Sequence, residues 1–305
     1  MRRHQRGAAL LIAVALLGLL AIATLARALS APAGVERQLA TERALTRARD
    51  ALIAYGALGN AAGSQNNSPG ALPCPDLDND GVSEQLAGNC TSNIGRLPWR
   101  TLGLGPLTDG AGECLWYARS PAFSNNIPTS ERGSSADKPA LNPATPGGIV
   151  EVAAGGPSGQ RVAAIVIAPG TALPGQTRGG AYSSAGCREG SIEQFIEGTT
   201  VEGVSYSHVG GSFALALAGR EDFNDSVLTI DTTRLFSTAG ARVLGEIALS
   251  SDGTPPYDWW TNNAWCEHVC VSPSGTGAAV RLANGSLIIR PLPVLPACAA
   301  PCSGS

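Results

Sequence analysis

The first 55 residues change their hydrophobic pattern once, and each half predicts a helix. A basic leader containing Arg2, Arg3 and Arg6 ends at Gly7, and residues 8–26 before Arg27 then carry no charge and are almost entirely apolar. Roughly 18 or more apolar residues let a helix cross a bilayer, so this stretch predicts a transmembrane helix. The basic leader should stay on the cytoplasmic side, which places the chain after residue 30 outside that membrane.

From residue 35 onward, apolar positions recur at helical spacing among good helix formers such as Ala, Arg, Glu and Gln. These positions are Val35, Leu39, Leu45, Leu52, Ile53 and Tyr55. Pro32 and Gly34 can kink the junction between the two patterns. A helix over residues 8–55 would be about 70 Å long at 1.5 Å per residue. The sequence therefore predicts one long helix, apolar in its first half and amphipathic in its second.

The rest of the chain predicts a head that is rich in short strands. A linker of Gly, Asn and Ser over residues 58–70 ends the helix. A continuous apolar run over 162–168 predicts a buried strand, and 213–217 and 227–230 predict two more. Asp231 is placed to cap a helix through Leu235, Val243 and Ile247. Residues 279–282 and 286–290 predict a hairpin around Asn284-Gly285.

Composition supports a turn-rich head and excludes one class of partner. The chain has 38 Gly and 21 Pro, only 15% charged residues and 5% aromatic residues. A formal net charge of −3 offers no basic surface for nucleic acid. The expected fold class is α+β: a long N-terminal membrane and spindle helix followed by a disulfide-bonded, β-rich globular domain.

The cysteines predict disulfides in an oxidising compartment. The chain has eight, which are Cys74, Cys90, Cys114, Cys187, Cys266, Cys270, Cys298 and Cys302. Cys74 and Cys90 are expected to pair, because they would enclose a short acidic loop. The spacing leaves the remaining connectivity open. A zinc site that uses the last four cysteines with His268 is the alternative hypothesis.

The acidic loop between Cys74 and Cys90 has a regular pattern of side chains that could bind a metal ion. Asp76, Asp78 and Asp80 alternate and are followed by Gly81, as at the start of an EF-hand calcium loop. Position 9 is Glu84, whereas position 12, where such loops carry a bidentate Glu, is Ala87. The pattern predicts Ca²⁺ bound by Asp76, Asp78, Asp80 and Glu84. The alternative is a solvated turn held by a disulfide.

Enzymatic chemistry has little support in the sequence. The segments around Ser158 and Ser212 do not match a nucleophile elbow, and the Gly-Gly pairs are not followed by the Lys-Ser/Thr of a phosphate loop. We therefore expect a protein that is not an enzyme. The tryptophans are expected in the core, except that Trp259-Trp260 beside Pro255-Pro256 could form an exposed adhesive patch.

Three interpretations compete for the N-terminus: a signal peptide cut near residues 31–33, a plain membrane anchor, and a prepilin leader cut after Gly7. A basic leader ending in Gly, an apolar helix and its amphipathic continuation resemble the type IV pilins and type II secretion pseudopilins. The resemblance implies a leader over 1–7, a helix over 8–57 and a head over 58–305. A prepilin peptidase would cut between Gly7 and Ala8, and the new amine would be methylated.

One departure from the family narrows the expected role. Most major pilins have Glu at the fifth mature position, where it neutralises a neighbour's N-terminal amine, but this chain has Ile12. The resemblance therefore implies a minor subunit at the tip or at initiation. Its partners would be other pilins or pseudopilins, contacted through the N-terminal helix. The protein would sit in the inner membrane with its head in the periplasm, and later in a filament or at the cell surface.

Several phrases of the head are similar to a family of large prepilin-like proteins of Gram-negative bacteria. They include Leu-Pro-Cys-Pro-Asp-Leu-Asp-Asn-Asp-Gly from Leu72 and Gly-Arg-Leu-Pro-Trp-Arg-Thr-Leu-Gly-Leu from Gly95, and the similarity runs to about residue 250. Cys114 stands where that family would have a basic residue, so the resemblance suggests Cys187 as its particular partner. The alternative function is a secreted or membrane-anchored periplasmic binding or adhesin protein.

Overall fold

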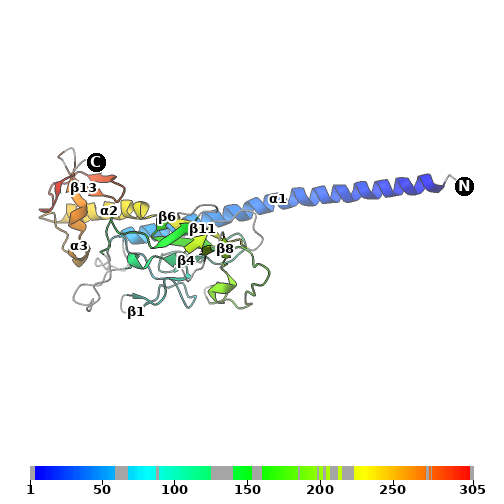
Figure 1. Ribbon diagram of the computed structural model, residues 1–305, viewed down its shortest axis with the longest axis horizontal. Coiled ribbons are helices and arrows are strands. Elements are labelled where there is room, and N and C mark those ends of the chain that lie inside the picture. The colour runs from blue at the N-terminus through cyan, green and yellow to red at the C-terminus, as the bar shows by residue number, and fades with distance from the viewer. Residues whose placement is uncertain are drawn as a thin grey trace.

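The computed structural model describes a helical rod that carries an α+β head (Figure 1). The described residues are 4–58, 68–86, 89–124, 140–152, 160–184, 186–197, 199–201, 204–206, 212–214, 223–272, 275 and 277–302. The helices are α1 (His4–Leu58), α2 (Thr232–Leu249) and α3 (Asp258–Asn262). The short 3₁₀ turns are η1 (Pro121–Phe123), η2 (Ile192–Gln194) and η3 (Trp265–His268).

The strands of the head form several small sheets. The central sheet is antiparallel, in the order β11 (Ser226–Ile230), β7 (Ala164–Ala168), β4 (Trp116–Arg119), β3 (Ile94–Arg96). The C-terminal sheet has the order β14 (Leu287–Arg290), β13 (Ala278–Arg281), β12 (Val269–Val271), β15 (Ala300–Pro301), with β12 and β15 parallel. A third has the order β10 (Ser212–Ala214), β5 (Ile149–Val152), β6 (Gln160–Val162). Two pairs complete the set, β1 (Gln85–Leu86) with β2 (Asn89–Cys90) and β8 (Thr199–Val201) with β9 (Val204–Tyr206).

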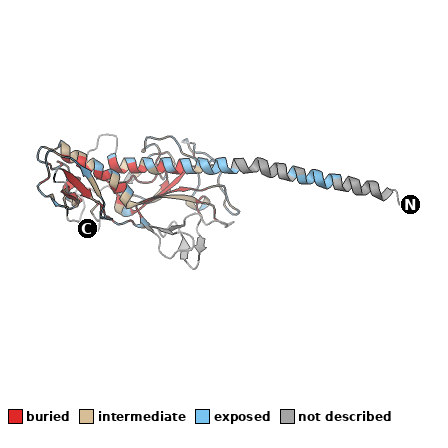
Figure 2. Ribbon diagram, turned by 90° about the horizontal axis from the view of Figure 1, so that it is seen from above, coloured by how far each residue is buried: buried red, intermediate tan, exposed pale blue. Residues whose placement is uncertain are grey.

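The C-terminal part of α1 is built into the head, and Figure 2 shows its burial beginning well along the helix. The buried residues are Ala44, Leu45, Ala48, Leu52, Ile53, Gly56 and Ala57. Val35 and Leu39, which lie on the same apolar stripe, are 58% and 41% exposed, so the stripe extends beyond the part of α1 that the head covers. The reason is geometric: helical spacing marks a face, but only the length over which the head contacts α1 determines burial.

The end of α1 has its carbonyl groups satisfied by distant parts of the chain. The Gly70 N–H donates to the Gly56 carbonyl at 2.7 Å, and Arg242 of α2 donates from Nη1 to the Ala57 carbonyl at 3.3 Å. Such partners compensate the last carbonyls of a helix.

Among the helices of the described residues, none is long and apolar enough to cross a membrane.

Strand β7 explains the continuous apolar run in the sequence. Ala164, Val166 and Ala168 belong to the main core, which is shared with α1 and α2. Ile165 and Ile167 lie in a second cluster, which includes Trp116 and Phe195. A strand covered on both faces has no solvent side, so its sequence does not alternate. The predicted buried strand over 162–168 is confirmed for Ala164–Ala168, whereas Val162 ends β6 in another sheet.

Helix α2 follows its predicted cap and apolar stripe. The Asp231 Oδ1 accepts the Arg234 N–H at 2.7 Å, and Leu235, Val243 and Ile247 are buried. Gly240, which weakens the helix locally, leaves room for the Val280 side chain of β13. The predicted hairpin is also present, with β13 paired to β14 in antiparallel register.

The aromatic side chains around α3 join the core rather than the surface. Trp259, Trp260 and Trp265 are all buried, and the rings of Trp259 and Trp265 meet edge to face with centroids 6.3 Å apart. The Arg242 guanidinium lies 5.7 Å from the Trp259 ring. The alternative of an exposed Trp259-Trp260 patch is therefore wrong.

Four disulfides cross-link the head. They join Cys74–Cys90, Cys114–Cys187, Cys266–Cys298 and Cys270–Cys302. The last two attach the C-terminal tail to η3 and β12, a connectivity that the spacing had left open. The alternative zinc site with His268 is wrong, because all four of its thiols are consumed in disulfides.

Candidate functional site

The acidic loop brings its four predicted ligands together. Oxygens of Asp76, Asp78, Asp80 and Glu84 all lie within 4.8 Å of one another. Asp76 is buried at the base of the loop, Asp78 is exposed, and Asp80 and Glu84 are half-buried. The alternation in the sequence therefore becomes a convergent set of carboxylates at one side of the head.

Backbone N–H groups hold the loop in this shape. The Asp76 Oδ1 accepts the Asn79 N–H at 2.6 Å, and its Oδ2 accepts the Gly81 N–H at 2.7 Å. The Glu84 Oε2 accepts the Leu77 N–H at 2.6 Å and closes the loop. Gly81 has a φ of 89°, a conformation that favours glycine. A Cβ at Gly81 would also overlap the Trp99 indole. The turn therefore requires glycine for two reasons, the backbone conformation and the lack of space for a side chain.

The charges of the cluster oppose one another. Burial raises the pKa of the Glu84 carboxyl to about 7, and the negative charges of Asp76 and Asp78 add to the shift. Burial also raises the pKa of Asp76, although the N–H groups of Gly81 and Asn79 oppose the rise. Crowded carboxylates of this kind are stabilised by a cation placed among them.

The donor set fits calcium. Ca²⁺ binds carboxylate oxygens at about 2.3–2.6 Å, so oxygens on opposite sides of one ion are about 5 Å apart. The 4.8 Å spread of the four side chains is compatible with that sphere. The position expected for a closing Glu, Ala87, lies outside the described residues. Asp76, Asp78, Asp80 and Glu84 would hold the ion, and its chemistry would be structural.

The loop is braced from three directions before any ion binds. Asn79 donates from Nδ2 to the Cys187 carbonyl at 3.2 Å, and the Ser83 N–H donates to the Thr101 Oγ1 at 2.8 Å. Asp76 exchanges backbone hydrogen bonds with Arg96 at 3.0 and 2.7 Å. A cavity of about 410 Å³, partly lined by Asp76, Asp78 and Arg96, lies beside the loop.

Arg96, which the sequence did not mark as important, helps to position the acidic loop. Its guanidinium lies 4.1 Å from the Trp116 ring and 4.1 Å from the Phe195 ring. Burial lowers the pKa of Arg96 to about 10, opposed by the nearby charges of Glu113 and Asp76. Arg96 therefore stays cationic at neutral pH. It also donates to the Arg188 carbonyl at 2.6 Å, which joins the acidic loop to the segment around Cys187.

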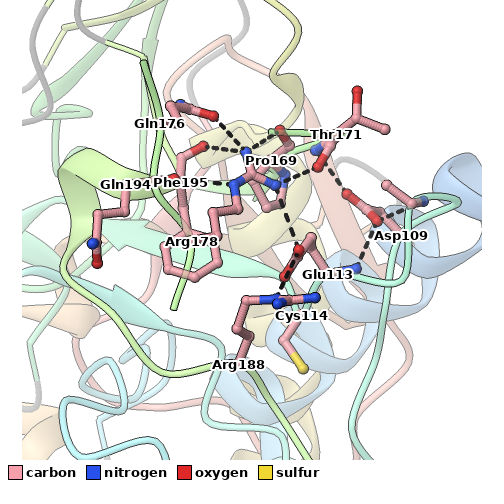
Figure 3. A network of polar contacts seen from close by, with 12 residues as sticks. Asp109, Glu113, Cys114, Pro169, Thr171, Gln176, Arg178, Arg188, Gln194 and Phe195 are labelled. Atoms are coloured by element: carbon pink, nitrogen blue, oxygen red, sulfur yellow. Dashed lines mark hydrogen bonds and ion pairs between the residues drawn. The ribbon is translucent and has the colours of Figure 1, made fainter. Parts of the chain in front are cut away.

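Arg178 organises a second buried network, which Figure 3 shows from close by. It donates to the carbonyls of Gly170 at 2.6 Å and Gln194 at 3.0 Å, among others. Its Nη1 is 3.7 Å from the Glu113 Oε1, and that same oxygen is 3.2 Å from the Arg188 Nε. No local pattern marks these residues, because their partners are backbone carbonyls set by the fold.

Gly7 and Ala8, the predicted cleavage and methylation site, lie within α1, where the structure describes only the backbone. The structure therefore adds nothing about their chemistry. Comparison with known proteins also leaves the function open: no protein-family model, no curated protein and no solved structure matches this chain.

Proposed function

We propose that the protein is a structural, pilin-like subunit of a type IV pilus or a type II secretion pseudopilus. In this proposal a prepilin peptidase cuts between Gly7 and Ala8, and the apolar helix is held in the inner membrane. The helix then packs against sister helices in a filament. The head faces the periplasm and caps, initiates or decorates the filament.

The observation that carries the proposal is the burial of the C-terminal part of α1 in the head, taken together with the apolar sequence that precedes it. The sequence of residues 8–26 is uncharged and apolar, as a membrane or a filament core requires. The residues from Ala44 to Ala57 are built into the core of the head. Because α1 runs from His4 to Leu58 as one helix, it would connect a filament core directly to the head.

Ile12 supports a minor role within such a filament. A carboxylate buried in an apolar bundle needs a cationic partner, because an unpaired buried charge is costly. A chain with Ile12 in place of that carboxylate cannot neutralise a neighbour's amine. It suits a place where that pairing is not needed, such as the tip or the initiating layer.

N-terminal sequencing and intact mass of the protein from its native membrane test this proposal. We expect a start at Ala8 with one added methyl group. A Gly7→Leu variant should retain the leader, because the peptidase must accommodate the residue before the cut. Gly18→Leu is the matched control and should be cut normally, since a Cβ at Gly18 meets nothing within 4 Å.

The alternative is a secreted or membrane-anchored binding protein, and the same measurement separates it. A start near residues 31–34 in the wild-type protein, or an intact Met1, would contradict the pilin-like proposal. The structure removes one argument for an adhesin, because Trp259 and Trp260 are buried and do not form an exposed aromatic patch.

We also propose that the acidic loop binds Ca²⁺ as a structural ion. Ligand that binds only the folded state at about ten times its dissociation constant stabilises by about 1.4 kcal/mol. We therefore expect added CaCl₂ to raise the melting temperature of the chelator-treated protein. Asp78→Asn should abolish the rise, whereas Asp252→Asn, an equal change of charge at another exposed site, should keep it. An equal rise in the wild type and Asp78→Asn, or none in either, would contradict calcium binding at this loop.

A further inference from the structure

Glu197 and Asp225 lie far from the acidic loop, and the carboxyl group of each accepts a hydrogen bond from the backbone N–H of the other. The Glu197 N–H donates to the Asp225 Oδ2 at 3.1 Å. In return, the N–H groups of Asn224 and Asp225 donate to the Glu197 Oε2 at 3.1 and 3.2 Å. Glu197 follows η2, and Asp225 directly precedes β11. The pair, named the carboxyl clasp here, therefore ties the loop after β7 to the start of the edge strand β11.

Asp225 is the buried member of the carboxyl clasp, whereas Glu197 is half-buried. Asp225 is only 2% exposed, and its Oδ1 accepts no hydrogen bond from the described residues. The Glu197 carboxyl group lies beside it, because its Oε2 accepts the Asp225 N–H at 3.2 Å. The Glu197 Oε1 has a neutral partner, the Gln176 amide, at 2.7 Å. Two adjacent carboxylates in such a place repel each other strongly unless one is protonated.

The charged groups around the carboxyl clasp do not neutralise it. Arg178 is the cation that acts on Asp225, but its donors are engaged by backbone carbonyls and by Gln176. Asp109, whose Oδ2 accepts the Gly170 N–H, adds a negative charge from the β3–β4 connection. Arg37 and Glu42 of α1, whose charges are opposite, line the same cavity as Asn224, the neighbour of Asp225.

We propose that Asp225 is protonated while the carboxyl clasp is closed, and that the clasp loosens when Asp225 ionises beside the Glu197 carboxyl group. The clasp is independent of the proposed assembly role and of calcium. Its opening would release the start of β11, the strand that borders α1 in the cavity between them.

The direction of the pH effect follows from linkage. Burial first, and the charge of Glu197 second, raise the pKa of Asp225 well above its usual range in the closed state. In the open state the carboxyl returns to its usual pKa. Between these two pKa values, opening releases one proton, so the closed state loses up to a factor of ten in its equilibrium per pH unit as pH rises. Above the raised pKa the loss levels off.

Hydrogen exchange of the full-length protein in detergent tests the carboxyl clasp. Amide protection in residues 191–197 and 223–230 is measured from pH 5 to 9 and corrected for the exchange of unprotected amides. We expect wild-type protection to fall by up to tenfold per pH unit before levelling off. Asp225→Asn should be flat, because its carboxamide still accepts from the Glu197 N–H and does not ionise over this pH range.

Two further variants keep the outcome decisive. Asp231→Asn makes the same change at an exposed helix cap and should keep the wild-type slope. Glu197→Gln should narrow the pH range over which protection falls, because burial alone then raises the pKa of Asp225, and it replaces Asp225→Asn should that variant not fold. A flat wild-type profile, or the wild-type slope in both clasp variants, would overturn the proposal.

Discussion

The strongest test of the architecture is to remove one side chain from the half of α1 that lies in the head. Leu52 is fully buried in the main core, between the central sheet and α2. Leu52→Ala removes buried methyl groups and leaves a cavity that the surrounding core cannot fill. Comparable Leu→Ala changes cost about 3–5 kcal/mol. We expect about 3 kcal/mol here, because α1 is a surface helix that can move slightly inward.

Leu58→Ala is the matched control. Leu58 ends the same helix, but its side chain is 75% exposed. The same chemical change there should alter the free energy of unfolding by no more than about 0.5 kcal/mol. For a chain of this size, 1 kcal/mol moves the melting temperature by roughly 2–4 °C, so Leu52→Ala should lower it by roughly 6–12 °C.

The assay is guanidinium unfolding of the full-length protein in detergent with its disulfides intact. Tryptophan fluorescence reports the transition, because Trp259 and Trp265 lie in the same core as Leu52. An unfolding free energy for Leu52→Ala within about 0.5 kcal/mol of that for Leu58→Ala would refute the reasoning. It would mean that α1 lies against the head without being part of its core.

Two further changes test the local arguments. Asp231→Ala should cost about 1 kcal/mol in thermal or chemical unfolding by leaving the Arg234 N–H without its acceptor, whereas Asp231→Asn should keep most of the stability. Gly110→Ala should destabilise the docking of α1 by about 1–3 kcal/mol, because its Cβ would overlap the carbonyl of Arg37. Gly105→Ala, where a Cβ meets nothing within 4 Å, should be nearly neutral in the same unfolding experiment.

Elements that depend on residues close together in the chain could be predicted from the sequence. The α2 helix begins where Asp231 can accept an N–H of the first turn, and β13 and β14 meet around Asn284-Gly285. The acidic loop belongs to the same class. Alternating Asp residues and Gly81 are adjacent in the chain, so their convergence needs only the turn that Gly81 permits.

Other features needed contacts between distant residues. The pairing of Cys266 with Cys298 and of Cys270 with Cys302 depends on how the tail returns to η3 and β12. Cys266 and Cys270 have the same spacing in the sequence as Cys298 and Cys302. This spacing therefore does not indicate which cysteine of the tail bonds to which cysteine of η3 or β12. Val35 lies on the same apolar stripe as Leu52, yet the head covers only Leu52.

By itself, the sequence determined the elements whose stability is local: a helix with its cap, a hairpin with its turn, a strand too apolar for any surface, and an acidic loop. Only the tertiary structure decided which of their faces are covered, how the cysteines pair, and that the Arg178 side chain and Asp225 are buried. The physical reason is that burial and charge depend on neighbours brought from elsewhere in the chain. Backbone carbonyls, which are the main partners of Arg178, leave no mark on the sequence of side chains.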